Sequence, residues 1–219
     1  RYDQLFTGVL LITRSSCTKE LPPTEPPPGN TVIYYDKNSS AQVVSQIFNY
    51  NGQSEVNLTN DLMHNYWWIK VSGDKAKFLC YRSPKVNNNY LDNKSNDYAN
   101  ADLMVFNIDG TNPKVIIQKG KYGWSEQGVA KFSPDGTKIL MAALCTDPAR
   151  GSNDLHWRLV ITDINGNNPK IISTRNSLFA DPAWSPDGKK IVYVTLPPGM
   201  LIGYQDQFEL YAADYNATT

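Results

Sequence analysis

"DPAWSPDGKKIVYV" (Asp181 to Val194) places a Ser-Pro-Asp-Gly segment directly before an apolar run. The stretch "GVAKFSPDGTKILMAAL" (Gly128 to Leu144) has the same order. A degenerate copy, "KVSGDKAKFL" (Lys70 to Leu79), keeps the serine, the aspartate and the second lysine. Proline presets φ at the second position of such a turn, and glycine adopts positive φ at its end. Each copy therefore predicts a turn followed by a buried strand.

The aspartates of these turns are predicted to be structural. A carboxylate at this position accepts local backbone N–H groups, which stabilises the turn. Because the segment recurs before each apolar run, it is typical of a repeating architecture and not of a single active site. The residues assigned to the turns are Asp74, Asp135, Gly136, Asp187 and Gly188.

A second repeated segment carries an Asn-Gly or Asp-Gly dipeptide between apolar residues. Residues 47–58, 105–116 and 161–172 superimpose without gaps, and residues 211–219 begin a fourth copy that stops at its turn. The dipeptides begin at positions 51, 109 and 165, which are 58 and 56 residues apart. Asn-Gly between two strands predicts a type I′ hairpin, in which both central residues have positive φ.

The two segments alternate, and together they predict a four-stranded antiparallel meander as the repeating unit. The second strand of each unit, such as "KIVYV" (residues 190–194), is apolar without alternation, which favours sheets covered on both faces. Repeats of four-stranded units indicate an all-β protein with a β-propeller fold, of which about three and a half blades are present. A solenoid and a sandwich are the alternatives, but neither explains the fixed order of the turns.

The motifs "FSPDG", "WSPDG", "LYAAD" and "ING" followed by "NP" resemble the TolB-type (WD40-like) β-propeller repeat, and the resemblance covers most of residues 30–219. The family includes a periplasmic protein of the Tol–Pal system of the cell envelope. Related propellers form the non-catalytic domain of prolyl-oligopeptidase-like enzymes and the scaffold of oligogalacturonate lyases. The first unit begins at its second strand and the last stops at its final turn. We therefore expect a fragment that lacks the C-terminal blades.

Residues 1–20 resemble a bacterial lipoprotein signal. An apolar segment (residues 5–13) precedes two small residues and Cys17, the candidate for lipid attachment. Residues 21–29 are rich in proline and are predicted to be a stiff linker. The resemblance implies a protein of the periplasm or outer membrane, tethered to the membrane through acylated Cys17. The alternative is an N-terminal segment whose cysteine has no such role.

Charge and residue types limit the classes of function. The chain has 21 basic and 21 acidic residues, so nothing in it predicts a nucleic-acid partner. The string "GWSEQG" (residues 123–128) has one residue too many for a nucleophile elbow. The two histidines, His64 and His156, occupy non-equivalent positions in their repeats. We predict no catalytic residue, no metal ligand and no cofactor in these residues.

The meander places both short turns of each unit on one face of the propeller. The longer insertions, residues 84–101, 146–156 and 197–207, fall on the opposite face. Loops on a rigid scaffold concentrate recognition residues, and aromatic side chains are good anchors. The candidate partner-binding residues are Tyr90, Tyr98, Trp124, His156, Tyr204 and Asp206.

The preferred hypothesis is a non-catalytic scaffold that binds a protein or a glycan at the cell envelope. The alternative is the propeller domain of a larger enzyme, either a serine peptidase of the prolyl-oligopeptidase type or a polysaccharide lyase. For Trp67, Trp68 and Trp184 we expect packing between blades and no contact with a partner.

Overall fold

A computed structural model describes residues 32–37, 45–84, 98–172, 182–195 and 209–214. The predictions on Cys17, on the signal-like segment and on the proline-rich linker lie outside these residues, as do those on Tyr90, Tyr204 and Asp206. In the part of the chain that is described, no helix has the length and apolar character needed to span a membrane.

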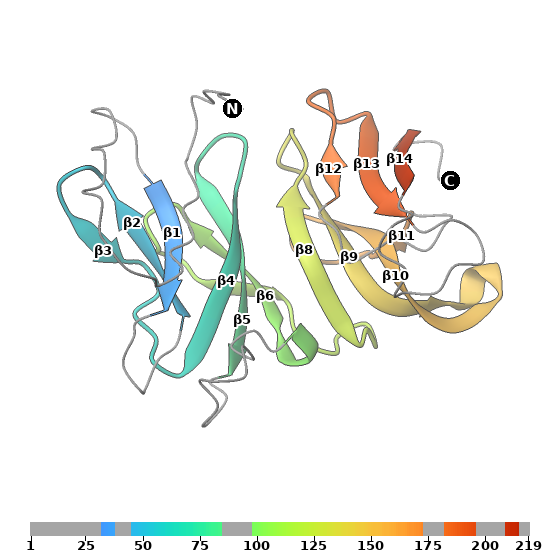
Figure 1. Ribbon diagram of the computed structural model, residues 1–219, viewed down its shortest axis with the longest axis horizontal. Coiled ribbons are helices and arrows are strands. Elements are labelled where there is room, and N and C mark those ends of the chain that lie inside the picture. Colours follow the sequence, from blue (N-terminus) through green and yellow to red (C-terminus); the bar gives the residue numbers. More distant parts are fainter. Residues whose placement is uncertain (1–31, 38–44, 85–97, 173–181, 196–208, 215–219) are drawn as a thin grey trace.

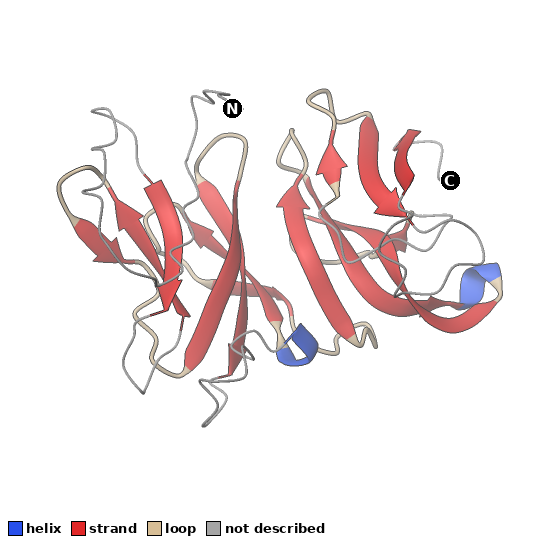
Figure 2. Ribbon diagram, viewed as in Figure 1, coloured by secondary structure: helices blue, strands red, loops and turns tan. Residues whose placement is uncertain are grey.

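The described strands form four antiparallel sheets in which each strand pairs with the next one along the chain (Figures 1 and 2). The first sheet contains β1 (Val32–Lys37), β2 (Ser45–Tyr50) and β3 (Glu55–Asn57). The second contains β4 (His64–Val71), β5 (Lys77–Pro84), β6 (Asp102–Asn107) and β7 (Lys114–Ile117). The third contains β8 (Glu126–Phe132), β9 (Lys138–Asp147), β10 (Ser152–Asp163) and β11 (Lys170–Ile171). The fourth contains β12 (Ala183–Trp184), β13 (Lys190–Thr195) and β14 (Glu209–Asp214).

This topology confirms the predicted meander and the partial β-propeller. Within the described residues the first sheet begins at the strand equivalent to β5, and the fourth ends at the strand equivalent to β6. The four sheets do not close into a ring (Figure 1).

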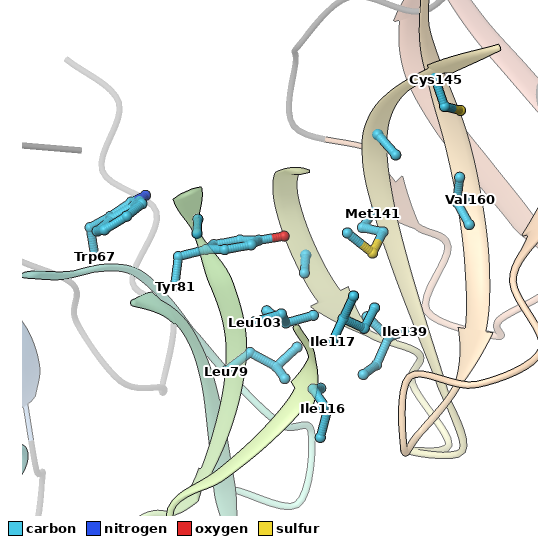
Figure 3. Packing of buried hydrophobic residues seen from close by; sticks show 13 residues of the cluster. Trp67, Leu79, Tyr81, Leu103, Ile116, Ile117, Ile139, Met141, Cys145 and Val160 are labelled. Carbon is cyan, nitrogen blue, oxygen red and sulfur yellow. The ribbon is translucent and has the colours of Figure 1, made fainter. Parts of the chain in front are cut away.

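Buried side chains fill the spaces between successive sheets. Phe78 and Cys80 of β5 face the first sheet, whereas Leu79 and Tyr81 of the same strand face the third sheet (Figure 3). A strand covered on both faces has no polar side, which explains why its sequence shows no alternation. The hydroxyl of Tyr81 also donates a hydrogen bond across the gap between sheets, to the carbonyl oxygen of Gly128. Each fully buried leucine or phenylalanine contributes about 1.5–3 kcal/mol to stability.

The Ser-Pro-Asp-Gly turns have the predicted structure. In the turn between β8 and β9, the Ser133 hydroxyl donates to the Asp135 carboxylate (2.6 Å) and accepts from the N–H of Lys138 (2.9 Å). Asp135 also accepts the N–H of Thr137, and Gly136 has φ 69°. The Asp187 turn repeats these bonds, as does the degenerate Asp74 turn.

The prediction of type I′ hairpins at the Asn-Gly and Asp-Gly dipeptides is wrong. Glycines 52, 110 and 166 have positive φ, but the asparagine or aspartate before each of them does not. In the β6–β7 hairpin the N–H of Gly110 donates to the Asn107 carbonyl, and the N–H of Asn107 donates to the Thr111 carbonyl. The tip of this hairpin is a type I turn followed by the left-handed Gly110, and a second residue with positive φ, Asn112 (φ 52°), comes before β7 begins at Lys114.

The predicted loop at residues 146–156 is mostly strand. β9 and β10 extend past the other strands of their sheet as a hairpin arm, which closes with the 3-10 turn η2 (Pro148–Arg150). A bulge in β10 between Ser152 and His156 interrupts the pairing. Asp147 and Arg158 are both buried, and their charged groups lie 4.0 Å apart at the base of the arm. The pairing offsets the cost of burying these two charges, because a buried charge without a partner would be strongly destabilising.

The described turns and connections lie on two faces of the propeller, whereas most of the predicted insertion at residues 84–101 and all of that at 197–207 lie outside the described residues. The β4–β5, β8–β9 and β12–β13 turns lie together at the top of Figure 1 and mark what we call the turn face. The β3–β4 and β7–β8 connections and the hairpin arm lie at the bottom, together with the 3-10 turn η1 (Tyr98–Asn100), on what we call the loop face.

Candidate functional site

The structure describes three of the six residues proposed to bind a partner, namely Tyr98, Trp124 and His156. For Tyr98 only the backbone is described, in η1 on the loop face. Trp124 lies on the β7–β8 connection and is half-buried, with its ring 4.9 Å from that of Tyr122 and packed against the core between the second and third sheets. His156 is half-buried on β10, where it pairs with Cys145 of β9. Trp124 therefore contributes mainly to packing.

The tryptophans expected to pack between sheets do so. Trp67 is fully buried in β4, not on an inter-blade segment, and stacks on Tyr81 with the ring centroids 6.2 Å apart. Trp68 and Trp184 are half-buried against the neighbouring cores. Cys80 and Cys145 are buried free thiols in two different inter-sheet cores, so they do not pair with each other.

A polar network that the sequence analysis did not find lies on the loop face where β4 begins. Asp61, in the β3–β4 connection, accepts a hydrogen bond from His64 Nδ1 at 2.7 Å and another from the Tyr66 hydroxyl at 2.8 Å. The N–H of Met63 donates to the other oxygen of the same carboxylate at 2.8 Å. All four residues come from one short stretch, but they meet because the chain reverses at Asp61 to enter β4.

The local environment sets the charge of this network. Partial burial raises the pKa of the Asp61 carboxyl, but the hydrogen bonds from Met63, Tyr66 and His64 outweigh it and leave the pKa below its usual value. Burial also raises the pKa of Tyr66, and its bond to the Asp61 carboxylate raises it further. Asp61 is therefore ionised at neutral pH, and His64 Nδ1 carries the proton that the carboxylate accepts.

The network continues across the sheet through two charged residues. Tyr66 pairs with Arg82 of β5, and the Arg82 guanidinium forms an ion pair of 2.8 Å with Asp102 of β6. The other carboxylate oxygen of Asp102 accepts the N–H of Lys119, at the start of the β7–β8 connection. The network therefore links two connections of the loop face and holds both against the strands.

The hydrogen bonds and the ion pair of this arrangement hold the connections of the loop face in place. An Asp–His pair can act as a base for a nucleophile, yet among the described residues no serine, threonine or cysteine side chain bonds to His64. Over the same residues, no group of three His, Cys, Asp or Glu side chains could hold a metal ion. What the network provides is a rigid loop with partly exposed His64 and Asp61 side chains (31% and 25%).

Sequence reasoning missed this network for a physical reason. Asp61, His64 and Tyr66 match no motif, and Arg82 meets Asp102 only through the pairing of β5 with β6. One available signal was the segment "NDLMHN" (residues 60–65), which places two large apolar residues among polar ones in a connection between strands.

Comparison with known proteins supports the propeller assignment. No family model matches the chain. The Tol-Pal system protein TolB of Wigglesworthia glossinidia brevipalpis is 46% identical over 48 residues, which are 22% of this chain and 11% of that protein. TolB of Blochmanniella pennsylvanica is 35% identical over 100 residues, 41% of this chain and 22% of that protein. The chain is therefore similar in sequence to TolB proteins over these segments, and its fold is that of a β-propeller. The matched segments span less than a quarter of the length of either relative.

Solved structures agree with this assignment at the level of the fold. A TolB structure from Agrobacterium tumefaciens has a TM-score of 0.56 and 16% identity, covering 85% of this chain and 59% of that one. An oligogalacturonate lyase in complex with manganese has the same TM-score and identity, covering 80% of this chain and 46% of that one. Similarity at this level of identity shows the propeller fold alone, because one fold hosts many unrelated functions.

Proposed function

We propose that this TolB-type propeller is a non-catalytic scaffold of the bacterial cell envelope that binds a protein partner through its loop face. The observation that carries the proposal is the local sequence identity of 46% and 35% with two TolB proteins of the Tol-Pal system. The loop face supports it, because the Asp61 and Asp102 networks fix two connections there in defined positions. Rigid presentation lowers the entropic cost of binding.

Site-specific photocrosslinking in cells of the source organism tests this function. A photoreactive residue is placed at Lys119 or Asp154 on the loop face, and at Lys75 or Lys189 on the turn face as matched exposed controls. We expect adducts with an envelope protein from the loop-face positions and none from the turn-face positions. Equal labelling from both faces, or no adduct from the loop face, would reject the proposal.

Membrane attachment through Cys17 is a separate part of the proposal. The lipoprotein-like order of residues 1–29 supports it, with an apolar segment, small residues, a cysteine and a proline-rich linker. Metabolic labelling with a palmitate analogue should modify the wild-type chain and not the Cys17→Ala variant. The variant should also leave the membrane fraction. A variant that still incorporates palmitate would exclude Cys17 as the lipidation site.

The alternative function is the propeller domain of a larger enzyme. Its support is structural similarity to a puromycin-hydrolyzing peptidase of Mycobacterium tuberculosis, with a TM-score of 0.57 and 14% identity over 85% of this chain and 29% of that one. The full gene product, incubated with a fluorophosphonate probe, separates this alternative from the scaffold. Covalent labelling of an active-site serine would establish a serine hydrolase, whereas a scaffold stays unlabelled.

A further inference from the structure

The β3–β4 loop, residues 58–63, presents two adjacent large apolar side chains to solvent. Leu62 is 70% exposed and Met63 is 69% exposed. Single exposed apolar residues are common on protein surfaces and need no explanation. These two are consecutive, they lie on the loop face, and they stand between Asp61 and His64 of the polar network.

The loop is held by Leu58, which packs against the core between the first and second sheets, and by polar side chains, but not by Leu62 or Met63. Gln46, which is 5% exposed, donates through Nε2 to the carbonyl oxygens of Asp61 (2.6 Å) and His64 (3.2 Å). Its Oε1 accepts from the Thr59 hydroxyl (2.8 Å) and the Asp61 N–H (2.9 Å). One buried amide therefore makes four hydrogen bonds to three residues, Thr59, Asp61 and His64, and none of these bonds involves Leu62.

The loop's first residues are fixed in the same way. Asn57 accepts the N–H groups of Thr59 (3.0 Å) and Asn60 (2.9 Å), and Asn60 holds a left-handed conformation with φ 43°. A non-glycine residue in this region persists only when its surroundings determine it. Because the loop is already fixed before binding, its backbone loses little conformational entropy when a partner binds. More of the free energy gained by burying its exposed side chains therefore contributes to affinity.

We propose that the β3–β4 loop is a preformed docking element, and that Leu62 and Met63 insert into an apolar pocket on a protein partner. This inference rests on the proposed function and specifies the class of partner and the residues that anchor it. Methionine adapts to irregular apolar pockets, and an apolar anchor surrounded by polar groups is the usual form of an interface hot spot.

The composition of the loop favours a protein over a lipid or a sugar. Residues 58–65 contain no lysine or arginine, which an anionic membrane surface would require. The segment also has no phenylalanine, tyrosine or tryptophan ring that a sugar could stack upon, and the nearest such ring in the sequence, that of Tyr66, is 4% exposed. Asp61 holds His64 through Nδ1, so the Nε2 edge of the ring is oriented to contact a polar group at the rim of the pocket.

The test begins with a photoreactive residue at Met63 in the full chain, expressed in cells, with Val56 of β3 as the control position. Val56 is also an exposed aliphatic side chain, at 52%. The captured protein is then purified, and its affinity is measured for the wild type, for the Leu62→Ala/Met63→Ala double variant and for Val56→Ala. We expect at least a tenfold loss for the double variant and less than twofold for Val56→Ala. Thermal unfolding of each variant confirms that the fold is intact.

Several results would overturn the inference. An adduct from Met63 to another segment of this chain would show that the loop is covered internally. The wild type could bind anionic phospholipid vesicles while the double variant does not, with no protein adduct from Met63. That result would show that the loop contacts a membrane instead of a protein. A photoreactive residue at Lys119 or Asp154 could capture a partner that binds the wild type and the double variant with equal affinity. That result would reject the β3–β4 loop as the docking element but would leave the proposed function standing.

Discussion

The two glycine turns of each repeat look alike in the sequence but have different neighbours in the fold. A Cβ added at Gly136, in a Ser-Pro-Asp-Gly turn, would have nothing within 4 Å. A Cβ added at Gly166, in an Asn-Gly turn, would lie 2.5 Å from the Ile116 carbonyl oxygen and 2.5 Å from Ile117 Cγ1. Ile116 and Ile117 belong to the outer strand of the preceding sheet. Gly136 therefore has open space around it, whereas Gly166 is packed against the preceding blade.

The same inter-blade contact occurs one repeat earlier. A Cβ at Gly110 would lie 2.8 Å from the Leu58 carbonyl oxygen, next to the outer strand of the first sheet. Around Gly166 the contact is reinforced, because its carbonyl oxygen accepts hydrogen bonds from the Tyr122 hydroxyl (2.7 Å) and from Lys121 Nζ (3.3 Å). Repetition of a motif therefore does not reveal whether it serves the blade itself or the contact between blades.

Gly166→Ala tests the inter-blade role and should have the largest effect. The added methyl group meets a backbone carbonyl that cannot rotate away, and alanine is also strained at φ 71°. Overpacking and the left-handed conformation together should lower the free energy of unfolding by about 3 kcal/mol or more. Chemical denaturation of the purified chain measures the loss. Gly110→Ala is the matched variant one repeat earlier and should be strongly destabilising for the same reason.

Gly136→Ala tests the local role and should have a smaller effect. Its φ of 69° is close to that of Gly166, but no atom opposes the new methyl group, so only the backbone strain remains. We expect a loss of about 1–2 kcal/mol by the same measurement. A loss equal to that of Gly166→Ala would remove the distinction between the two turns.

Lys75→Gly is the reverse substitution, because it introduces a glycine at a turn position where the other variants remove one. Lys75 occupies the glycine position of the degenerate turn, with φ 60°, and its N–H donates to the Ser72 carbonyl as Gly136 does to Ser133. Glycine should relieve the strain, but it also loses more conformational freedom on folding. The net gain should be about 0.5 kcal/mol in the free energy of unfolding. A destabilised variant would show that the Lys75 side chain stabilises this turn in a way that outweighs its strain.

Much of the fold could be predicted from the sequence because the turns carry local information. The positions of Asp135 and Gly136 followed from the conformations that each residue type adopts, and the strand order followed from the repeat. The type I′ prediction failed because an Asn-Gly dipeptide suits both a two-residue and a three-residue hairpin. The β9–β10 arm was missed because the bulge before His156 hides the pairing of its strands.

The candidate site was less predictable than the fold. The Gln46 side chain contacts the β3–β4 loop across 15 residues of sequence, and such a contact has no periodic signal. The prediction that recognition residues gather on the loop face directed attention to the face on which the Asp61 network lies. It selected aromatic residues, however, and one of these, Trp124, packs against Tyr122. The exposed pair Leu62 and Met63 was not selected.

The pH dependence of the Ser-Pro-Asp-Gly turn should give the smallest effect. Hydrogen bonds from the Ser133 hydroxyl, then from the N–H and hydroxyl of Thr137, lower the pKa of Asp135 to about 2. In the unfolded chain the pKa of an aspartate is about 3.9. A lowered pKa in the folded state stabilises the fold above the unfolded value, and this contribution is lost as the pH falls from about 4 to about 2.

Asp135→Asn isolates this contribution, because asparagine keeps the acceptor oxygen but does not titrate. The difference in unfolding free energy between the wild type and the variant should be constant above about pH 4 and should shrink toward pH 2. When both proteins also carry Ser133→Ala, this difference in unfolding free energy should decrease less toward pH 2, since the largest cause of the low pKa of Asp135 is absent. Because the carboxylate is solvent-exposed, screening keeps the whole effect small. If the stability advantage of the wild type over the variant grew as the pH fell, the charge of Asp135 would destabilise the folded state. That result would contradict the role of the carboxylate in the turn.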